Sequence, residues 1–123
     1  MIIVQSKNCD LNFYKSIHDA QSDLEARDVS TGEYVNVCDE NGLIYKLELL
    51  KKPGRLSEGS FQIILTDKYD REMPKRMLMA LGERLLGFNQ AKNIVDNIHS
   101  IKEANDQIIR QWKEKNTTKK FSS

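Results

Sequence analysis

The chain has 123 residues, of which 39% are hydrophobic and 30% are charged, and its formal net charge is +1. This length and composition are typical of one folded domain and exclude a disordered chain. The near-zero net charge argues against a dedicated nucleic-acid-binding protein, which is normally strongly basic overall or on one face. No apolar run approaches the roughly 18 residues that a membrane-spanning helix requires.

The first predicted elements are a strand and a helix. Residues 1–6 are apolar and partly β-branched, which predicts a buried strand. A helix is expected next, because Asp10 or Asn12 can accept hydrogen bonds from the unpaired N–H groups of a first turn. Four apolar residues would lie on one face of this helix: Phe13, Ile17, Ala20 and Leu24.

The middle of the chain predicts a hairpin and a further strand. Residues 33–38 alternate in polarity, Asn41-Gly42 is a strong hairpin turn signal, and residues 43–50 form the returning strand. The odd positions of the returning strand should face the core, while Lys46 and Glu48 should face solvent. Residues 51–60 are rich in turn formers, and the nearly continuous apolar run 61–66 predicts a central strand.

Two helices are expected to complete the fold. The first begins near Pro74 and ends at Gly87, and the second runs from about residue 90 to residue 115. The second carries an apolar seam made of Ile94, Ile98, Ile101, Ile108 and Trp112. The order β-α-β-β-β-α-α predicts an α+β fold, a mostly antiparallel sheet of about four strands with helices on one face. We expect a single domain over residues 1–115 and a flexible basic tail over residues 116–123.

Residues that could carry chemistry are few. Cys9 and Cys38 are expected to be reduced thiols of a cytoplasmic protein, because no secretory signal precedes the first strand. His18 and His99 have no second ligand at helical spacing, so no metal site is predicted. The glycines form no phosphate-binding pattern, and we predict no cofactor and no catalytic residues. The basic C-terminal third could touch nucleic acid or an acidic membrane, but helix dipoles also favour basic helix ends.

The most uneven feature is the charge of residues 19–48, which hold eight acidic and two basic side chains. A solvated face, a recognition surface and a pair of catalytic carboxylates are all compatible with this excess. As a recognition surface it would use seven of the acidic residues: Asp19, Asp23, Glu25, Asp28, Glu33, Asp39 and Glu40.

The first 50 residues also resemble a known class of protein. Asp10-Leu11, Phe13-Tyr14, Ser16-Ile17 and Asp19-Ala20, followed by Gly32-Glu33-Tyr34 and by Gly42 and Tyr45, are similar to small bacterial immunity proteins of polymorphic toxin and contact-dependent growth inhibition systems. The resemblance implies a cytoplasmic, non-enzymatic protein that neutralises a cognate toxin domain, such as a nuclease with a basic surface. It also implies a monomer or weak homodimer that binds neither nucleic acid directly nor a membrane.

The toxin-binding surface implied in this way would be the acidic one, because complementary charge speeds encounter and rejects wrong partners. The alternative is a structural or adaptor module that self-associates through the long C-terminal helix. Substitution of Ile101 or Ile108 by aspartate would be expected to abolish such a dimer.

Overall fold

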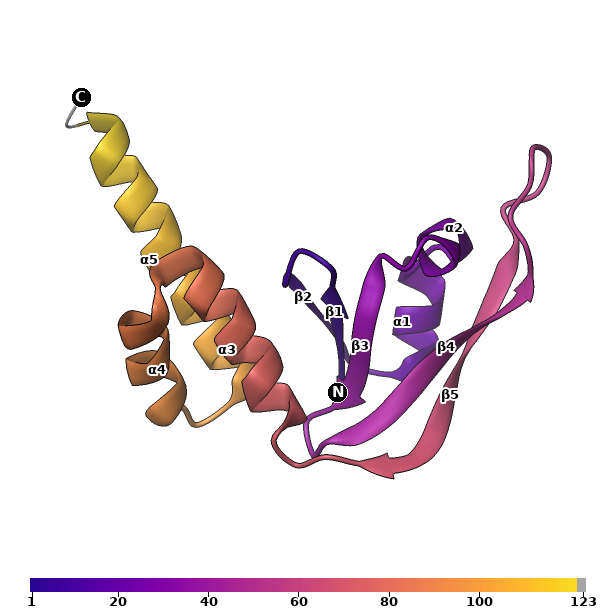
Figure 1. Ribbon diagram of the computed structural model, residues 1–123, viewed down its shortest axis with the longest axis horizontal. Helices are drawn as coiled ribbons and strands as arrows, with labels where there is room; N and C mark the ends of the chain where they lie inside the picture. Colours follow the sequence, from indigo (N-terminus) through magenta and orange to yellow (C-terminus); the bar gives the residue numbers. More distant parts are fainter. Residues whose placement is uncertain (122–123) are drawn as a thin grey trace. The chain divides into compact units, whose positions relative to one another are not determined.

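A computed structural model describes residues 1–121 of the protein, the last four of them by their backbone alone. The chain divides into two compact units, one over residues 1–74 and one from Lys75 onward. The first unit contains β1 (Ile2–Ser6), β2 (Leu11–Tyr14), α1 (Ile17–Asp23), α2 (Ala26–Ser30), β3 (Tyr34–Asp39), β4 (Leu43–Lys51) and β5 (Ser60–Tyr69) (Figure 1). The helical unit follows, with α3 (Met73–Leu86), α4 (Phe88–Asp96) and α5 (Ile101–Phe121).

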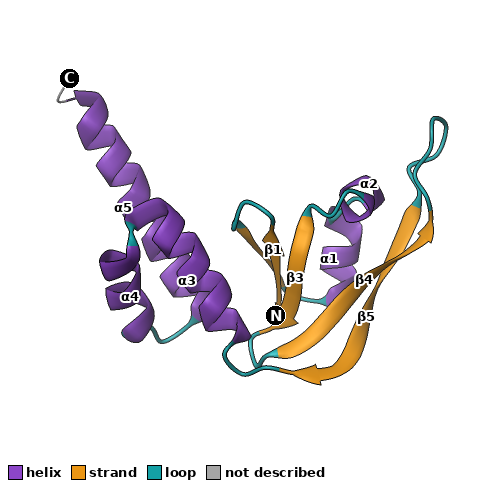
Figure 2. Ribbon diagram, viewed as in Figure 1, coloured by secondary structure: helices purple, strands orange, loops and turns teal. Residues whose placement is uncertain are grey.

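The first unit is an antiparallel sheet with the strand order β2-β1-β3-β4-β5 (Figure 2). The predicted α+β class is confirmed, with five strands in place of about four. The prediction that residues 61–66 form a central strand is wrong, since β5 lies at the edge of the sheet. Its apolar run has another cause, because Phe61 and Ile63 are buried in the core that α1 and α2 help to form.

The expected helix start at Asp10 or Asn12 is also wrong. Phe13 lies in β2, which returns alongside β1 after a tight turn in which Cys9 has a φ of 74°. The helix begins only at Ile17, where the Ser16 hydroxyl accepts a hydrogen bond from the Asp19 N–H at 3.1 Å. Phe13 and Ile17 are four residues apart, but they belong to different elements, so their spacing does not reflect a shared helix face.

The core of the first unit lies on one face of the sheet, between the strands and the two short helices. Alternate strand residues supply one side of it, because successive side chains of a strand point to opposite faces. The buried members are Ile2, Val4, Val37, Phe61 and Ile63 from the strands and Ala20, Leu24 and Ala26 from the helices. Tyr45, Leu47 and Leu49 pack against this cluster, which confirms the predicted orientation of the returning strand.

The predicted hairpin between β3 and β4 is confirmed, and its turn is fixed by two residues. The Asp39 carboxylate accepts from the N–H groups of Asn41 and Leu43 at 2.9 and 3.0 Å. Gly42 has a φ of 95°, and its N–H donates to the Asp39 carbonyl at 3.1 Å. A Cβ on Gly42 would lie 2.2 Å from the carbonyl oxygen of Asp70, so the end of β5 packs directly on the turn.

In the helical unit, the prediction of one helix over residues 90–115 is wrong, because the helical structure is interrupted between Asp96 and Ile101. Ser100 caps the new helix, and its hydroxyl accepts from the Glu103 N–H at 3.1 Å. The predicted apolar seam is therefore divided, with Ile94 on α4 and Ile108 on α5, and both side chains are buried.

The first helix of this unit matches its prediction, since α3 begins at Met73 and Gly87 follows its last residue. The last helix, α5, continues to Phe121, and so enters the segment predicted as a tail. Residues 122–123 of that segment lie outside the described residues.

Candidate protein-binding groove

The seven acidic residues predicted as a recognition surface lie in three places in the first unit. Asp19 and Asp23 lie on α1, and Glu25 directly precedes α2. Asp28 lies in α2 and Glu33 just before β3, while Asp39 ends β3 and Glu40 follows it in the β3–β4 turn. The structure thus places the seven residues in separate groups along the first unit.

One of these groups lines an open groove of about 610 Å³. One wall is the segment 21–27, which joins α1 to α2, and the other is the segment 58–61, which leads into β5. Asp23 and Glu25 stand on the first wall and Glu58 stands on the second, with Arg27 as the basic residue among them. All four side chains are exposed, so the groove presents three carboxylates and one guanidinium to solvent.

The two walls are held together by the side chain of Gln21. Its amide nitrogen donates to the carbonyl of Phe61, and its amide oxygen accepts from the N–H of Ile63 at 3.1 Å. A neighbouring strand would make the same two hydrogen bonds with β5, so the Gln21 side chain replaces a short strand at this edge. These two hydrogen bonds hold α1 against the start of β5 and so set the spacing between the two walls of the groove.

A second hydrogen bond orients one carboxylate at the groove. The hydroxyl of Tyr14, at the end of β2, donates to Asp23 at 2.6 Å. Burial raises the pKa of Tyr14, and the hydrogen bond to Asp23 and the negative charge of that residue raise it further. The hydroxyl of Tyr14 thus donates to Asp23 and orients this carboxylate at the groove.

The other acidic groups make contacts within the first unit. Asp28 accepts from the hydroxyl of Tyr34 at 3.3 Å. Burial and, to a smaller extent, the charge of Asp28 raise the pKa of that tyrosine, while a backbone hydrogen bond at Glu25 opposes the shift. Glu33 pairs with Lys7 at 3.4 Å, and Glu40 pairs with the N-terminal ammonium group at 3.4 Å. Part of the acidic excess is thus engaged in local contacts of the fold.

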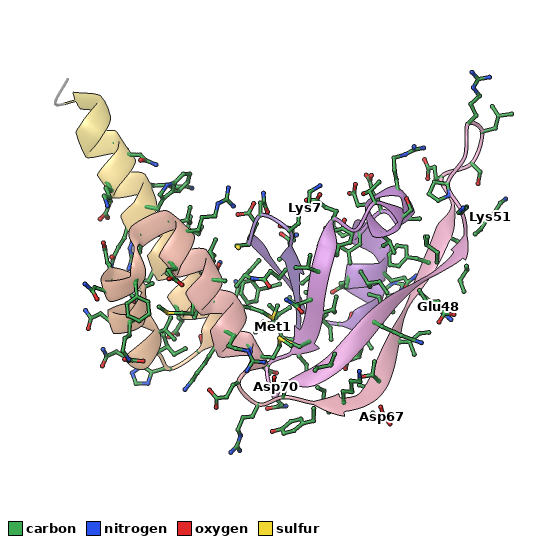
Figure 3. All side chains as sticks on the ribbon, in the orientation of Figure 1. Met1, Lys7, Glu48, Lys51, Asp67 and Asp70 are labelled. Carbon is green, nitrogen blue, oxygen red and sulfur yellow. The ribbon has the colours of Figure 1, made fainter. Side chains whose placement is uncertain are left out.

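A loop of opposite charge follows β4 and ends at the groove (Figure 2). It carries Lys52 and Arg55, and Figure 3 shows Lys51, the last residue of β4, where the strand passes into this loop. Leu56, between the basic residues and Glu58, is fully exposed. An isolated exposed leucine is common on protein surfaces, and this one directly follows Arg55 in the loop.

Sequence reasoning missed Glu58 as a member of the acidic group, because it lies 33 positions beyond Glu25 in the chain. Its neighbours, Ser57 and Gly59, indicate only a turn. The pairing of α1 with β5 through Gln21 is what brings the two segments together, and no local pattern predicts that contact.

Metal ligands, cysteines and long helices are the other features to consider in the described part of the chain. Within it, no three His, Cys, Asp or Glu side chains are grouped so that they could hold a metal ion. Cys9 and Cys38 are both thiols that are not joined in a disulfide, and burial raises the pKa of the Cys38 thiol to about 12. No helix over residues 1–121 is long and apolar enough to cross a membrane.

Comparison with known proteins found no match: no family model, no curated protein and no solved structure aligns with this chain.

Proposed function

We propose that this protein is a bacterial immunity protein that binds and neutralises a cognate toxin domain without catalysis of its own. The observation that carries the proposal is the acidic groove between segments 21–27 and 58–61, where Asp23, Glu25 and Glu58 converge from two distant parts of the chain. Asp19 lies on the exposed side of α1 in the same region of the sequence and adds a fourth carboxylate.

Charge is the first reason for this proposal. A toxin that acts on a polyanion has a basic surface around its active site, and exposed carboxylates attract such a surface from a distance. Exposed charges at the rim of an interface act mainly on the association rate and depend on ionic strength. The acidic groove would therefore speed the encounter with the toxin.

The loop that follows β4 supplies the second reason. A few anchoring side chains usually provide most of the affinity of a protein–protein interface. Leu56 is fully exposed on a loop that leads into the groove, and Arg55 precedes it directly. In the proposed complex, Leu56 enters an apolar pocket of the toxin while the groove contacts the basic surface.

The test uses the C-terminal toxin domain encoded by the gene immediately upstream and measures its association with the full-length protein. Combined Asp23→Lys and Glu25→Lys substitutions should lower the association rate at least tenfold at low salt, and the difference from the wild type should shrink as salt is raised. The matched control is Asp67→Lys with Glu72→Lys, two exposed acidic residues away from the groove. The proposal fails if no complex forms, or if both pairs of substitutions change the rate equally.

A further inference from the structure

The sheet of the first unit is split between β3 and β4. The two strands pair only next to their turn, at Val37 with Tyr45 and at Cys38 with Ile44. In Figure 1 they leave the turn together and then separate, with α2 at the open end. We refer to this opening as the β3–β4 fork.

A β-bulge in β3 explains the separation. Gln5 of β1 pairs with Asn36, but the next residue, Ser6, pairs with Tyr34, so Val35 is an extra residue in β3. A bulge bends its strand and increases the local twist. From Val35 toward its first residue, β3 therefore follows β1 and turns away from β4.

On the β4 side of the fork, backbone groups face the opening. Phe61 directs its C=O group and Ile63 its N–H group to Gln21, away from β4. The backbone groups of the residues that alternate with them, Gln62 and Ile64, therefore point toward β4. Ile64 lies opposite Lys46, and Gln62 lies opposite Glu48. The backbone groups of Lys46 and Glu48 consequently point to β5. The N–H and C=O groups of the intervening residues, Leu47 and Leu49, therefore point toward β3, where no strand pairs with them in the described structure.

The β3 side of the fork has the same character. The carbonyl of Glu33 accepts from the N–H of Lys7, at 2.8 Å, and so faces away from β4. Because successive residues of a strand alternate, the backbone groups of Tyr34 face the fork. Both edges of the fork thus offer the donors and acceptors that a sheet normally pairs.

A pocket of about 240 Å³ lies in the fork. Its side chains are aliphatic or aromatic: Val29 from α2, Tyr34, Val35 and Val37 from β3, and Tyr45 and Leu47 from β4. The side chain of Val35 is 51% exposed, so the pocket is accessible from solvent. Lys46 also lines the pocket, but it pairs with Glu48 at 3.4 Å, so the entrance has no unbalanced charge.

We propose that the β3–β4 fork binds an extended, uncharged segment of another protein, with an apolar side chain at every second residue. The segment pairs through its main chain with Leu47 and Leu49 and places one apolar side chain in the pocket against Val29 and Val37. Strand addition is an established mode of peptide recognition, in which backbone bonds supply affinity and pockets for alternate side chains supply specificity. This inference does not depend on the proposed immunity function, because the fork and the acidic groove involve different residues.

The observations distinguish this occupant from others. A helix cannot bind backbone groups at an open sheet edge, because its own N–H and C=O groups are already paired. A charged segment would gain nothing from an entrance in which Lys46 and Glu48 neutralise each other. The pocket has the volume of one or two medium-sized side chains, which suits a strand that presents one residue in two to the fork.

The experiment titrates the blocked peptide Ser-Val-Thr-Leu-Thr-Val-Ser into the isotopically labelled full-length protein and follows the backbone amides by NMR. The amides of Leu47 and Leu49 should shift and exchange more slowly with solvent, while those of Lys46 and Glu48 should already be protected in the free protein. The same peptide with alternate amides methylated should bind at least tenfold more weakly. Equal binding of the methylated peptide, or no binding at millimolar concentration, would overturn the proposal.

A matched pair of variants locates the site. Val35→Glu introduces a charge at the pocket entrance and should weaken binding at least tenfold, whereas Leu65→Glu, at a similarly exposed position on β5, should leave binding unchanged. The reverse result would assign the peptide to the outer edge of β5 and refute the inference. A free protein that is dimeric and already protected at Leu47 and Leu49 would also refute it, because the fork would then hold a second copy of the chain.

Discussion

Replacement of Gly82 by alanine tests the packing of the helical unit. Gly82 lies in α3, and a Cβ at this position would be 2.7 Å from the Cβ of Ala91 and 3.2 Å from the Cδ1 of Ile108. Carbon atoms in favourable contact are about 3.5–4.0 Å apart, so the new methyl group would be roughly 1 Å too close to α4. Gly82 is therefore the residue that allows α4 and α5 to approach α3.

Two opposing effects set the size of the change. Alanine is a better helix former than glycine by about 1 kcal/mol, which favours the variant. Forcing an extra methyl group into a packed contact costs about 1–3 kcal/mol, and here the neighbour is attached directly to a helix backbone and cannot rotate away. For this rigid neighbour we take the upper part of that cost, about 2–3 kcal/mol, and we therefore expect Gly82→Ala to lower the free energy of unfolding by about 1–2 kcal/mol.

Urea denaturation followed by circular dichroism measures this difference. With a slope of about 2 kcal/mol per molar urea, the midpoint should fall by about 0.5–1 M at unchanged slope. Addition of Ala91→Gly should recover part of the loss, because it removes the overlapping Cβ. Gly54→Ala is the control, since nothing lies within 4 Å of its added Cβ. A Gly82→Ala variant more stable than the wild type would refute the close approach of the helices.

Three further predictions concern single side chains. Gln21→Glu should destabilise the first unit by about 1–2 kcal/mol at pH 7, because a carboxylate cannot donate to the Phe61 carbonyl, and the deficit in urea midpoint should shrink at pH 4 as the new side chain is protonated. Burial raises the pKa of the Cys38 thiol from an ordinary 9.0 to about 12 in the folded state. The stabilisation linked to this shift is complete below pH 9 and is lost as the pH rises toward 12. The free energy of unfolding should therefore fall by about 1 kcal/mol more between pH 8 and pH 10 in the wild type than in Cys38→Ala, and parallel curves would contradict this. Ser100→Ala should cost about 1 kcal/mol by removing the cap of α5, with Ser100→Asp close to the wild type in thermal denaturation.

Elements with a strong local signal could be predicted from the sequence. The hairpin around Gly42 has alternating strands on both sides of a turn that needs a positive φ, so local and tertiary preferences agree. Pro74 and Gly87 likewise lie at opposite ends of α3, close to the bounds that they predict. In these segments the residues that define the element also define its limits.

The errors arose where two readings of one segment competed. The spacing of Phe13 and Ile17 fits a helix, but Ser16 is a better cap than Asp10, because it directly precedes the helix and accepts from Asp19. The pattern Ser100-Ile101-Lys102-Glu103 is that of a capping box and would have placed a helix start at Ile101. Ile94, Ile98 and Ile101 keep helical spacing across this segment, so their pattern does not reveal the interruption of the helix.

The candidate site could be predicted only in part. The acidic excess is visible in the sequence, but its distribution in space depends on contacts between distant segments. Glu58 reaches the groove because Gln21 holds α1 against β5, and the fork exists because Val35 is an extra residue in β3. Neither contact leaves a periodic pattern, so both required the structure.

The strand order of the first unit has a consequence for how the chain folds. β1 pairs with β2, β3 with β4, and β4 with β5, each through a connection of eight residues or fewer. In contrast, β1 meets β3 across the whole of β2, α1 and α2. Hairpins close within microseconds, but joining distant segments requires the loss of chain entropy before any contact compensates for it. The pairing of Ile3 with Cys38, at the centre of this junction and buried on both strands, is therefore the step that should set the folding rate of the unit.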